Sequence, residues 1–483
     1  MSSAGSMSRR VLLGLLGSVV PAAALAACGA SSTVTSASTS AAVASGAAGT
    51  TTGAATSAVG SSASTAAQPT AAAAAAPGGQ KVTLQFFSWN TGPAGTVEKS
   101  QTDAFVQANP GYTVQEVPTT ASNIDQKLNT AIAAGTPPDL FTHGPAATAV
   151  YAAPKQTISL DSYIAQVAGL QADFPPPVLA GGTWHGHVYQ VQWLANAGVL
   201  VYRTDYFKDA GLDPTKPPQT WNDLATDGQK LAQWNGSTIK RVGYNQPTTS
   251  FAAQQQFFAF AYQNGSPLFN ADFSQAQFND SASLEALQFA HDLVYKYKTT
   301  SATPITGDVP NVPLLVTGQV AMSWESPQAI TYARTYKQDT AASLTDSLPF
   351  QKVRAGTFLG GLGLQITSVS KHPDDAWKLI AWYLDPARMA DIAQANGQMP
   401  GRSSSAQVAS WIKSDPIMQN AVKAISIGVA NPTIPSWIEM RNTAIVPAVE
   451  QVMANKGDVK TALDTAVQKA NTLLQADLKK YGA

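Results

Sequence analysis

The chain has little charge and almost no cysteine. Only 12% of its 483 residues are Asp, Glu, Lys or Arg, about half the usual share, and 30 basic residues balance 30 acidic ones. A protein that binds nucleic acid through the phosphates needs a basic excess, so an electrostatic binder of nucleic acid is excluded. The one cysteine, Cys28, has no partner for an internal disulfide. A chain of this length can bury a core large enough to fold without disulfides or metals.

The missing charge is concentrated in one segment. No charged residue occurs between Arg10 and Lys81, and all ten tryptophans lie after that segment. Without Arg9 and Arg10, 28 basic residues remain against 30 acidic ones, so the part from Lys81 onward carries a formal charge of about −2. The sequence therefore divides into a short head, a charge-free segment and a mildly acidic body.

The head, residues 1–28, is typical of a bacterial export signal, with an arginine pair, an apolar run at 11–20 and small residues at its end. The run is too short for an ordinary transmembrane helix. Residues 8–13 (SRRVLL) resemble a twin-arginine export motif, and an ordinary secretory signal with two positive charges is the alternative. Residues 25–28 (LAAC) resemble a lipobox, which implies that Cys28 is lipid-modified and anchors the mature protein.

Residues 29–80 consist almost wholly of Ala, Ser, Thr, Gly and Val. This composition lacks the large apolar side chains that offset the loss of chain entropy, so it predicts a disordered tether. A flexible coil of this length has a root-mean-square reach of roughly 40 Å. Head and tether together predict a protein at the extracellular face of the bacterial cell membrane.

The body begins with a pattern of alternating strands and helices. Apolar periodicity and the Gly and Pro positions predict three strands at 81–89, 112–117 and 139–142, with helices at 97–108 and 124–132 between them. This βαβαβ order favours a largely parallel, doubly wound sheet. Ligands of such sheets bind at the carboxyl ends of the strands, so the loops after Trp89 and Thr142 are candidate binding positions.

Later elements repeat this style. Thr220 and Asp223 form a predicted capping box at the start of a helix. The pattern further predicts β structure at 188–202, strands at 320–324 and 358–366, helices at 283–296 and 374–384, and mainly helices in the last hundred residues.

The sequence gives no sign of a metal site, a cofactor or a catalytic motif. His185 and His187 have no nearby Cys, Asp or Glu at metal-ligand spacing, and we interpret them as part of a solvated turn. Residues 360–363 (GGLG) match no phosphate-binding loop and favour close backbone approach within a strand. No G-x-S-x-G elbow is present. A glycosidase stays open, since its two carboxylates can lie far apart in sequence.

Tryptophan, by contrast, is abundant where loops or strand ends are expected. Aromatic faces stack on the C–H faces of sugar rings, while amides and carboxylates take the hydroxyl groups. The tryptophans in such positions are Trp89, Trp184, Trp193, Trp324 and Trp437. Core packing is the alternative for each of them, and it is the better interpretation for Trp221, Trp377 and Trp382 on amphipathic helices.

Residues 186–231 (GHVYQVQWLANAGVLVYRTDYFKDAGLDPTKPPQTWNDLATDGQKL) resemble the signature of extracellular solute-binding proteins of ABC importers, the sugar-binding family that includes maltodextrin-binding proteins. Tyr202-Arg203 stands where the family has Tyr-Asn. Further similar stretches follow in family order at 134–140, 318–322, 360–373 and 432–474.

The resemblance implies an α/β fold with two doubly wound lobes, a hinge and an interlobe cleft, the periplasmic-binding-protein-like architecture. By this pattern residues 81–190 form lobe 1 with a returning segment near 345–400, and residues 191–344 form lobe 2 with parts of 401–483. It also implies a monomer without cofactor or enzymatic activity. This protein would bind a sugar or oligosaccharide by closing its lobes, and would deliver it to the membrane subunits of an ABC importer.

Carried over residue by residue, the resemblance implies a set of ligand-binding positions in the loops and strand ends that face the cleft. They are Trp89, Asn90, Thr142, His143, Gln192, Trp193, Trp324, Glu325, Gly360, Gly361, Trp437 and Arg441. The departures at His143 and Arg203 leave the identity of the sugar open. A surface-tethered carbohydrate-active enzyme, a binding protein for a non-sugar ligand and a binding protein that serves a sensor remain alternatives.

Overall fold

The computed structural model describes residues 81–120, 123–303, 305 and 313–482. The predictions for the head, for Cys28 and for the tether lie outside these residues. Within the described part of the chain, none of the helices has both the length and the apolar character needed to cross a membrane.

The first sheet contains the predicted βαβαβ unit. Its strands are β1 (Val82–Ser88), β2 (Tyr112–Pro118), β3 (Leu140–His143), β6 (Val191–Ala197), β12 (Thr357–Ile366), β13 (Met399–Pro400) and β14 (Gly428–Ala430), in the order β13-β6-β12-β3-β1-β2 with β14 beside β12. β1 pairs in parallel with both β2 and β3, as predicted. β12 runs antiparallel to β3 and to β6, because the chain re-enters this sheet from the second one. The sheet is therefore mixed rather than largely parallel.

The second sheet has five strands in the order β11-β7-β10-β9-β8. They are β7 (Val199–Arg203), β8 (Gln233–Asn235), β9 (Thr238–Tyr244), β10 (Val320–Glu325) and β11 (Leu344–Ser347). β9 and β10 are parallel, while β7 runs antiparallel to its two neighbours. A separate hairpin is formed by β4 (Thr183–Trp184) and β5 (His187–Val188).

Helices cover both faces of the first sheet. Phe86 of β1 points to Tyr383 of α12 (Pro373–Tyr383), with ring centroids 5.9 Å apart. The next residue, Phe87, packs in a cluster with α2 (Ile124–Ala133) on the opposite face, as the alternation of a strand requires. The other helices that pack with this sheet are α1 (Gly92–Ala108), α3 (Thr148–Ala152), α4 (Asp161–Ile164), α5 (Pro176–Gly181), α13 (Pro386–Asn396), α14 (Ser403–Val408), α15 (Ser410–Lys413) and α16 (Pro416–Ser426).

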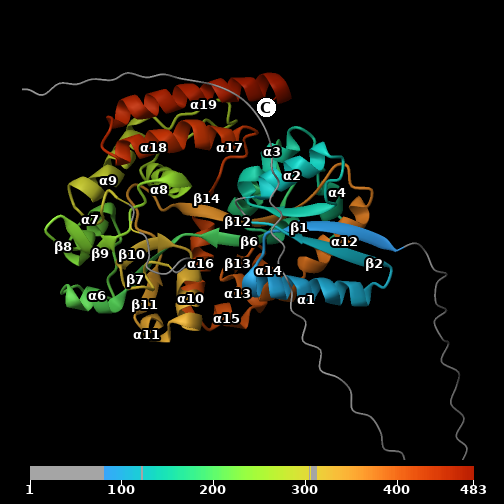
Figure 1. Cartoon of the computed structure of the whole chain (residues 1–483), viewed down its shortest axis with the longest axis horizontal. Helices are drawn as coiled ribbons and strands as arrows, with labels where there is room; N and C mark the ends of the chain where they lie inside the picture. Colours follow the sequence, from blue (N-terminus) through green and yellow to red (C-terminus); the bar gives the residue numbers. More distant parts are fainter. Residues whose placement is uncertain (1–80, 121–122, 304, 306–312, 483) are drawn as a thin grey trace, which may run out of the picture. The chain divides into compact units, whose positions relative to one another are not determined.

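One face of the second sheet packs in the core that includes the first sheet, while its other face packs in a core of its own, to which the end of the chain contributes. The C-terminal helices α17 (Trp437–Met440), α18 (Val446–Met453) and α19 (Val459–Tyr481) share that core with α7 (Trp221–Leu231), α8 (Ser250–Gln263) and α9 (Ser281–Tyr295). Figure 1 shows the red α18 and α19 alongside α8 and α9. The shorter helices α6 (Thr204–Asp209), α10 (Gln328–Tyr336) and α11 (Gln338–Ala341) complete this half.

The chain passes between the two sheets more than once. Gly198 alone separates β6 of the first sheet from β7 of the second, so the change of sheet occurs there and not at residue 191. The chain returns between β11 and β12, and it leaves again between β14 and α17. Residues 401–430 pack with the first sheet, so within 401–483 the part that joins the second sheet's core is the α17–α19 region.

Most predicted elements are present with shifted ends. The capping box is confirmed, because the Thr220 side chain accepts from the Asp223 N–H and the Asp223 side chain accepts from the Thr220 N–H. α1 begins at Gly92 rather than at residue 97, since Pro93 in its first turn is compatible with a helix start. His185 and Gly186 have φ angles of 50° and 77° and form the exposed turn of the β4–β5 hairpin, which confirms the predicted turn.

Candidate functional site

Four hollows lie at the strand ends and chain crossings that join the two sheets. The Trp89 hollow, of about 450 Å³, is lined by Trp89, Asn90, Gly361, Gln328, Asn396 and Gln398 among others. The Trp324 hollow, of about 200 Å³, is lined by Asn196, Gly198, Pro247, Gln255, Trp324, Glu325 and Phe358 among others. The two others are described below. Together with the Trp324 hollow they form a trough in which neighbouring hollows share lining residues, whereas the Trp89 hollow shares none of these residues.

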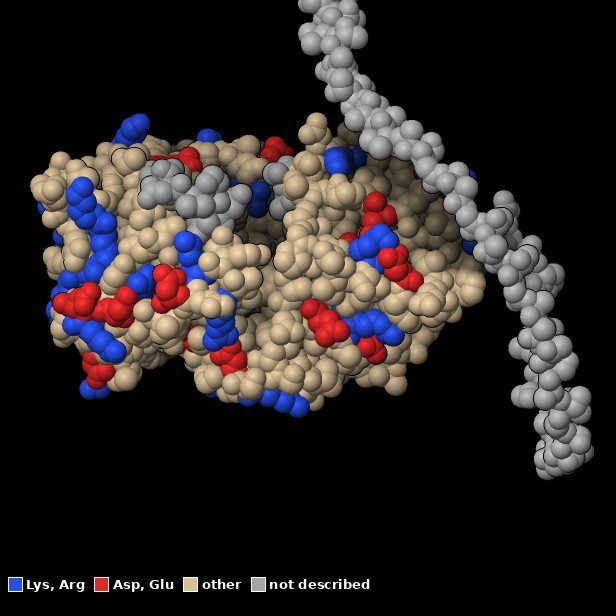
Figure 2. Space-filling model, turned by 60° about the horizontal axis from the view of Figure 1, so that its bottom comes forward, with Lys and Arg blue, Asp and Glu red and all other residues tan. Residues whose placement is uncertain are grey.

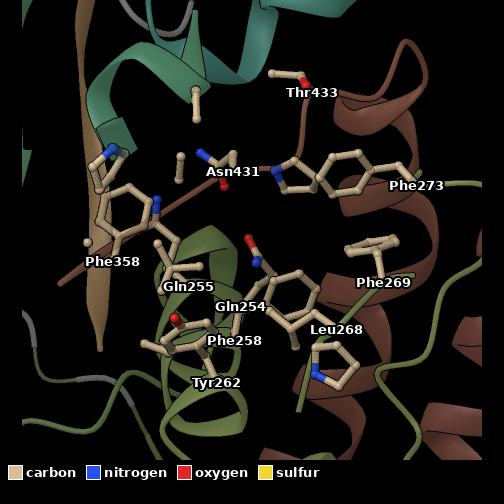
Figure 3. Close-up of a pocket in the computed structure, with 18 residues that line it drawn as sticks. Gln254, Gln255, Phe258, Tyr262, Leu268, Phe269, Phe273, Phe358, Asn431 and Thr433 are labelled. Carbon is tan, nitrogen blue, oxygen red and sulfur yellow. The ribbon is translucent and has the colours of Figure 1, made fainter. Parts of the chain in front are cut away.

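The phenylalanine hollow, of about 390 Å³, shares Gln255 and Phe358 with the Trp324 hollow. Figure 3 shows its lining, in which rings of α8 face the segment that follows β14. The main side chains are Gln254, Gln255, Phe258, Tyr262, Phe269, Phe273, Phe358, Asn431 and Thr433. The Trp184 hollow, of about 410 Å³, shares Ala180, Phe273 and Thr433 with it.

In the Trp89 hollow the polar groups are held by buried neighbours. Asn90 Nδ2 donates to Glu98 Oε2 at 2.5 Å, and Asn90 Oδ1 accepts from Asn396 Nδ2 at 3.0 Å. Glu98 is 3% exposed and also accepts from Ser88 Oγ. Burial raises the pKa of Glu98 to about 8, although the hydrogen bonds from Asn90 and Ser88 act in the opposite direction. The Asn90 amide is therefore fixed in one orientation.

Thr142 and His143, at the end of β3, support this hollow from below. Thr142 is fully buried and accepts a hydrogen bond from the Trp89 backbone N–H at 3.1 Å. The His143 ring lies 5.4 Å from the Trp89 ring, and its Nε2 lies 3.0 Å from Asp125 Oδ1. Burial acts to raise the pKa of Asp125, but the hydrogen bond and charge of His143 outweigh it and the pKa is lowered. Thr142 and His143 themselves do not line any of the four hollows.

Trp324 connects the second sheet to the chain crossings. Its indole Nε1 donates to Thr357 Oγ1 at 2.9 Å, and Thr357 Oγ1 donates to the Gly198 carbonyl at 2.7 Å. A Cβ on Gly198 would lie 2.3 Å from Trp324 Nε1, so only glycine admits the indole here. The neighbouring Glu325 lines the same hollow, and burial raises its pKa. The Thr357 hydroxyl thus links the two chain crossings, at Gly198 and at Thr357, to the Trp324 ring that lines the hollow.

The remaining predicted positions divide into buried and lining residues. Trp193 and Trp437 are fully buried in the two cores, and Gln192 is buried with its Nε2 bonded to Gln190. Gly361 lines the Trp89 hollow. A Cβ on Gly360 would meet the Phe358 ring at 2.8 Å, so this glycine lets the ring lie over the strand.

Arg441, the last of the predicted positions, follows α17 and does not line the hollows. Its Nε donates to Asn442 Oδ1 at 3.1 Å. Burial lowers the pKa of Arg441, and the charge of Asp125 acts against that shift. The guanidinium from the second half of the molecule therefore lies within electrostatic reach of a carboxylate from the first.

The match to known families covers most of the body. Residues 100–420 match the model of a family described as bacterial extracellular solute-binding protein, which is more than half of the chain. The chain belongs to this family of extracellular solute-binding proteins.

Relatives of this solute-binding protein are distant in sequence and similar in fold. The diacetylchitobiose binding protein DasA of Streptomyces coelicolor is 25% identical over 332 residues, which cover 66% of this chain and 73% of DasA. The sn-glycerol-3-phosphate-binding periplasmic protein UgpB of Shigella flexneri serotype 5b is 25% identical over 436 residues, 81% of this chain and 92% of UgpB.

Solved structures show the same fold. An ABC transporter solute-binding protein from Thermotoga lettingae, bound with alpha-D-tagatose, superposes with a TM-score of 0.72 at 24% identity and covers 81% of this chain and 99% of its own. The substrate-binding protein Lmo0181 from Listeria monocytogenes, in complex with cycloalternan, gives a TM-score of 0.71 at 20% identity, with coverages of 82% and 99%. The two-lobe, periplasmic-binding-protein-like fold that the resemblance implies is confirmed.

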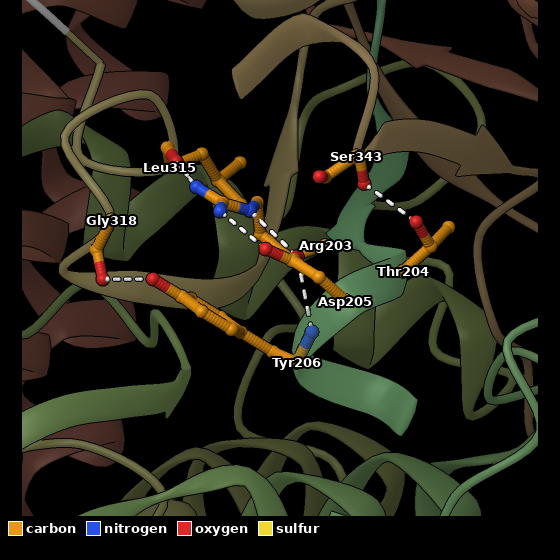
Figure 4. Close-up of polar contacts among 7 residues, drawn as sticks. All are labelled: Arg203, Thr204, Asp205, Tyr206, Leu315, Gly318 and Ser343. Carbon is orange, nitrogen blue, oxygen red and sulfur yellow. Dashed lines mark hydrogen bonds and ion pairs between the residues drawn. The ribbon is translucent and has the colours of Figure 1, made fainter. Parts of the chain in front are cut away.

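Arg203, which departs from the pattern of the solute-binding family, is not at the trough. Figure 4 shows its guanidinium paired with Asp205, with Nε to Oδ1 at 2.9 Å and Nη2 to Oδ2 at 2.6 Å. The Tyr206 ring lies between Arg203 and Arg241, at 4.4 and 4.2 Å. The Tyr206 hydroxyl donates to the Gly318 carbonyl at 3.0 Å. Arg203 therefore makes its contacts at the end of β7 and does not line the four hollows.

Sequence reasoning missed most of the phenylalanine hollow in this solute-binding protein. Phe258 and Tyr262 lie on α8, where aromatic residues at helical spacing predict core packing. Phe269, Phe273 and Asn431 lie in loops without a motif of their own. The one available signal was the glycine pair at 360–361, which predicts close approach. Gly360 makes room for the Phe358 ring, and Gly361 makes room for the backbone of Leu194.

Among the described residues, no Lys or Arg lines the four hollows, and the charged lining residues are Glu325, Asp272 and Asp477. Elsewhere, Figure 2 shows basic and acidic side chains in small mixed groups on the face that it displays. The described residues of the solute-binding protein also include no group of three or more His, Cys, Asp or Glu side chains that could hold a metal ion.

Proposed function

We propose that this protein is the membrane-anchored extracellular substrate-binding component of an ABC importer, which captures a sugar or oligosaccharide between its lobes and delivers it to the permease. Closure is driven by ligand contacts that exist on both lobes only in the closed state.

The observation that carries the proposal is the lining of the trough. Aromatic rings and amides alternate along it, with Trp324, Phe358 and Phe258 beside Asn196, Gln254 and Gln255. Rings stack on the C–H faces of a sugar, and amides take its hydroxyl groups. A relative and two fold neighbours that bind diacetylchitobiose, tagatose and cycloalternan, respectively, support a carbohydrate ligand.

The charge of the trough favours a neutral ligand. A phosphate or carboxylate ligand is bound best by Arg or Lys, and the described lining has neither. A ligand such as glycerol 3-phosphate, after which the UgpB relative is named, would therefore lack a cationic partner in the lining. The relatives DasA and UgpB are both named as binding proteins. We propose a binding protein and not an enzyme.

The central experiment is a binding screen on the purified body with tryptophan fluorescence and calorimetry, over neutral mono- and oligosaccharides, sugar phosphates and peptides. Binding of a neutral saccharide with a raised melting temperature and without product on long incubation is the expected result. Mass spectrometry of ligand retained on purification identifies the class independently. Binding of sugar phosphates or peptides alone, or turnover of a bound saccharide, would contradict the proposal.

The anchor is tested separately. Metabolic labelling with a fatty acid should mark the wild-type protein, while the Cys28→Ala variant should stay unlabelled and lose its membrane attachment. A matched Ser32→Ala variant in the tether should behave as wild type. Membrane retention of the Cys28→Ala protein would show that another segment holds it.

A further inference from the structure

The trough does not end at the phenylalanine hollow. Phe273 and Thr433 line both this hollow and the Trp184 hollow, so a ligand in the first can continue into the second. The Trp184 hollow is about as large as its neighbour, about 410 against 390 Å³. It is formed by the β4–β5 hairpin from the first half of the chain and by a loop and α19 from the second.

The walls of the Trp184 hollow carry the aromatic rings of Trp184 and Phe273 together with several hydrogen-bonding groups. Among the described residues, neither the Trp184 indole N–H nor the His185 imidazole has a hydrogen-bond partner, and the two rings lie 4.4 Å apart. Asp477 is 8% exposed, and one of its carboxylate oxygens accepts from the Ser436 backbone N–H at 3.0 Å. Asp272 adds a second, exposed carboxylate. A ring with donors and acceptors around it suits a polyhydroxylated ligand.

A buried polar group in the phenylalanine hollow also favours a ligand that carries hydroxyl groups. Gln254 is 1% exposed, and its Oε1 is buried without a hydrogen-bond partner. Figure 3 shows the Gln254 side chain among the residues that face the cavity, opposite Asn431. A buried acceptor without a partner is costly, so a turn of the Gln254 amide toward the hydroxyl of a ligand in this hollow would remove that cost.

We infer that the Trp184 hollow is a further saccharide subsite, and that the ligand is a linear, neutral oligosaccharide long enough to run from the Trp324 hollow past Gln254 to Trp184. This inference rests on the proposed function and adds a chain length to it. A monosaccharide would occupy only one hollow and leave Trp184 untouched, whereas a chain of three or more rings would stack its terminal unit there.

The test is a calorimetric series with gluco- and chito-oligosaccharides of one to six residues, on the wild-type body and on Trp184→Ala. The affinity of the wild type should increase with chain length up to the length that fills the trough. Trp184→Ala should weaken the longest bound saccharide about tenfold and change the affinity for the shortest by less than twofold. His185→Ala should give a smaller loss with the same dependence on length.

The hairpin offers a matched control. His187 lies two residues from His185, but its Nδ1 is 2.7 Å from Asp161 Oδ2 and it does not line the hollow. His187→Ala should leave every affinity unchanged, and melting curves identify variants whose hairpin no longer folds. Equal losses at all lengths, or none at any length, would overturn the subsite while the proposed function stands. Absence of binding for every saccharide would instead overturn the proposed function.

Discussion

The Trp89 hollow and the phenylalanine hollow differ in the groups that they offer to a polar ligand. In the first, Asn90 is already bonded on both sides of its amide, to Glu98 and to Asn396. In the second, the rings of α8 surround Gln254, whose side-chain oxygen has no partner. Each hollow also holds one buried acceptor without a partner, Gln398 Oε1 in the first and Gln254 Oε1 in the second, so the two hollows differ in the fixed Asn90 amide and in the apolar rings.

This difference assigns different tasks to the two hollows. The Asn90 amide, which is already held in place, selects the orientation of a ligand and loses little side-chain entropy when the ligand binds. The apolar wall of the phenylalanine hollow gains free energy from the ring area that a bound ligand buries. We therefore expect most of the affinity to come from the phenylalanine hollow and its neighbour around Trp324.

The largest expected effect is that of Phe358→Ala. The Phe358 ring lines both the Trp324 and the phenylalanine hollows, so its loss removes a stacking face from the centre of the trough. We expect about a hundredfold loss of saccharide affinity in calorimetry, the size typical of a central aromatic anchor. Trp89→Ala should cost only about tenfold, since the Trp89 ring serves one hollow whose amides are held independently. The reverse order of the two losses would contradict the comparison.

A smaller loss is expected when the Trp324 ring is released from the crossings. Thr357→Val keeps the shape of the buried side chain but removes the acceptor of the Trp324 N–H and the donor to the Gly198 carbonyl. Unsatisfied buried groups of this kind cost about 1–3 kcal/mol, so the denaturation midpoint should fall. Affinity should fall about tenfold, because the indole is no longer fixed.

Thr357→Ser provides the matched control for that experiment. It retains the hydroxyl, so it should restore most of the affinity and the fluorescence change on ligand binding, although it loses a methyl group. If valine and serine variants bind alike, the hydroxyl does not position Trp324.

Gln254→Met should separate binding from stability. Methionine has a similar length, so it removes the unpartnered oxygen without leaving a large void. The ligand-free protein should gain about 1 kcal/mol in free energy of unfolding, while saccharide affinity falls about fivefold. Denaturant titration and calorimetry measure the two changes. Gln468→Met, on the exposed face of α19, should change neither. A parallel loss of stability and affinity would show that Gln254 is a structural residue.

The sequence could predict the Trp89 hollow but not the phenylalanine hollow, and the reason is physical. Trp89 and Asn90 directly follow a strand whose period of two is visible in the sequence, and the carboxyl ends of parallel strands carry ligand sites. Phe258 and Tyr262 occupy a helix that is apolar on most sides, so nothing local distinguishes a ring that faces a cavity from one in the core.

Trp193 and Trp437 show the converse case, in which a tryptophan that the sequence places at the ligand site lies in the core. Both follow family-like motifs, yet both are fully buried. Trp193 packs on Tyr383 at a centroid distance of 4.7 Å, and Trp437 packs on Phe258 at 5.9 Å. Whether a tryptophan at a strand or helix end faces the core or the cavity depends on partners that lie far away in sequence.

The smallest effect on binding is expected for Glu98→Gln, which tests how the Asn90 amide of the Trp89 hollow is held. Glutamine can still accept from Asn90 and Ser88, so saccharide affinity at neutral pH should change less than twofold.

The pH dependence of stability should change more. Burial raises the pKa of Glu98 from 4.5 to about 8, so between these values the folded state holds a proton that the unfolded state has lost. The stability that Glu98 contributes is therefore complete below pH 4.5 and decreases as the pH rises to about 8, by up to about 1.4 kcal/mol per pH unit. Glutamine has no such proton, and the difference in free energy of unfolding between variant and wild type should increase over this range. Denaturation curves at successive pH values measure it. Parallel curves for the two proteins would mean that Glu98 titrates normally and that Asn90 is held by a charge instead of a protonated acid.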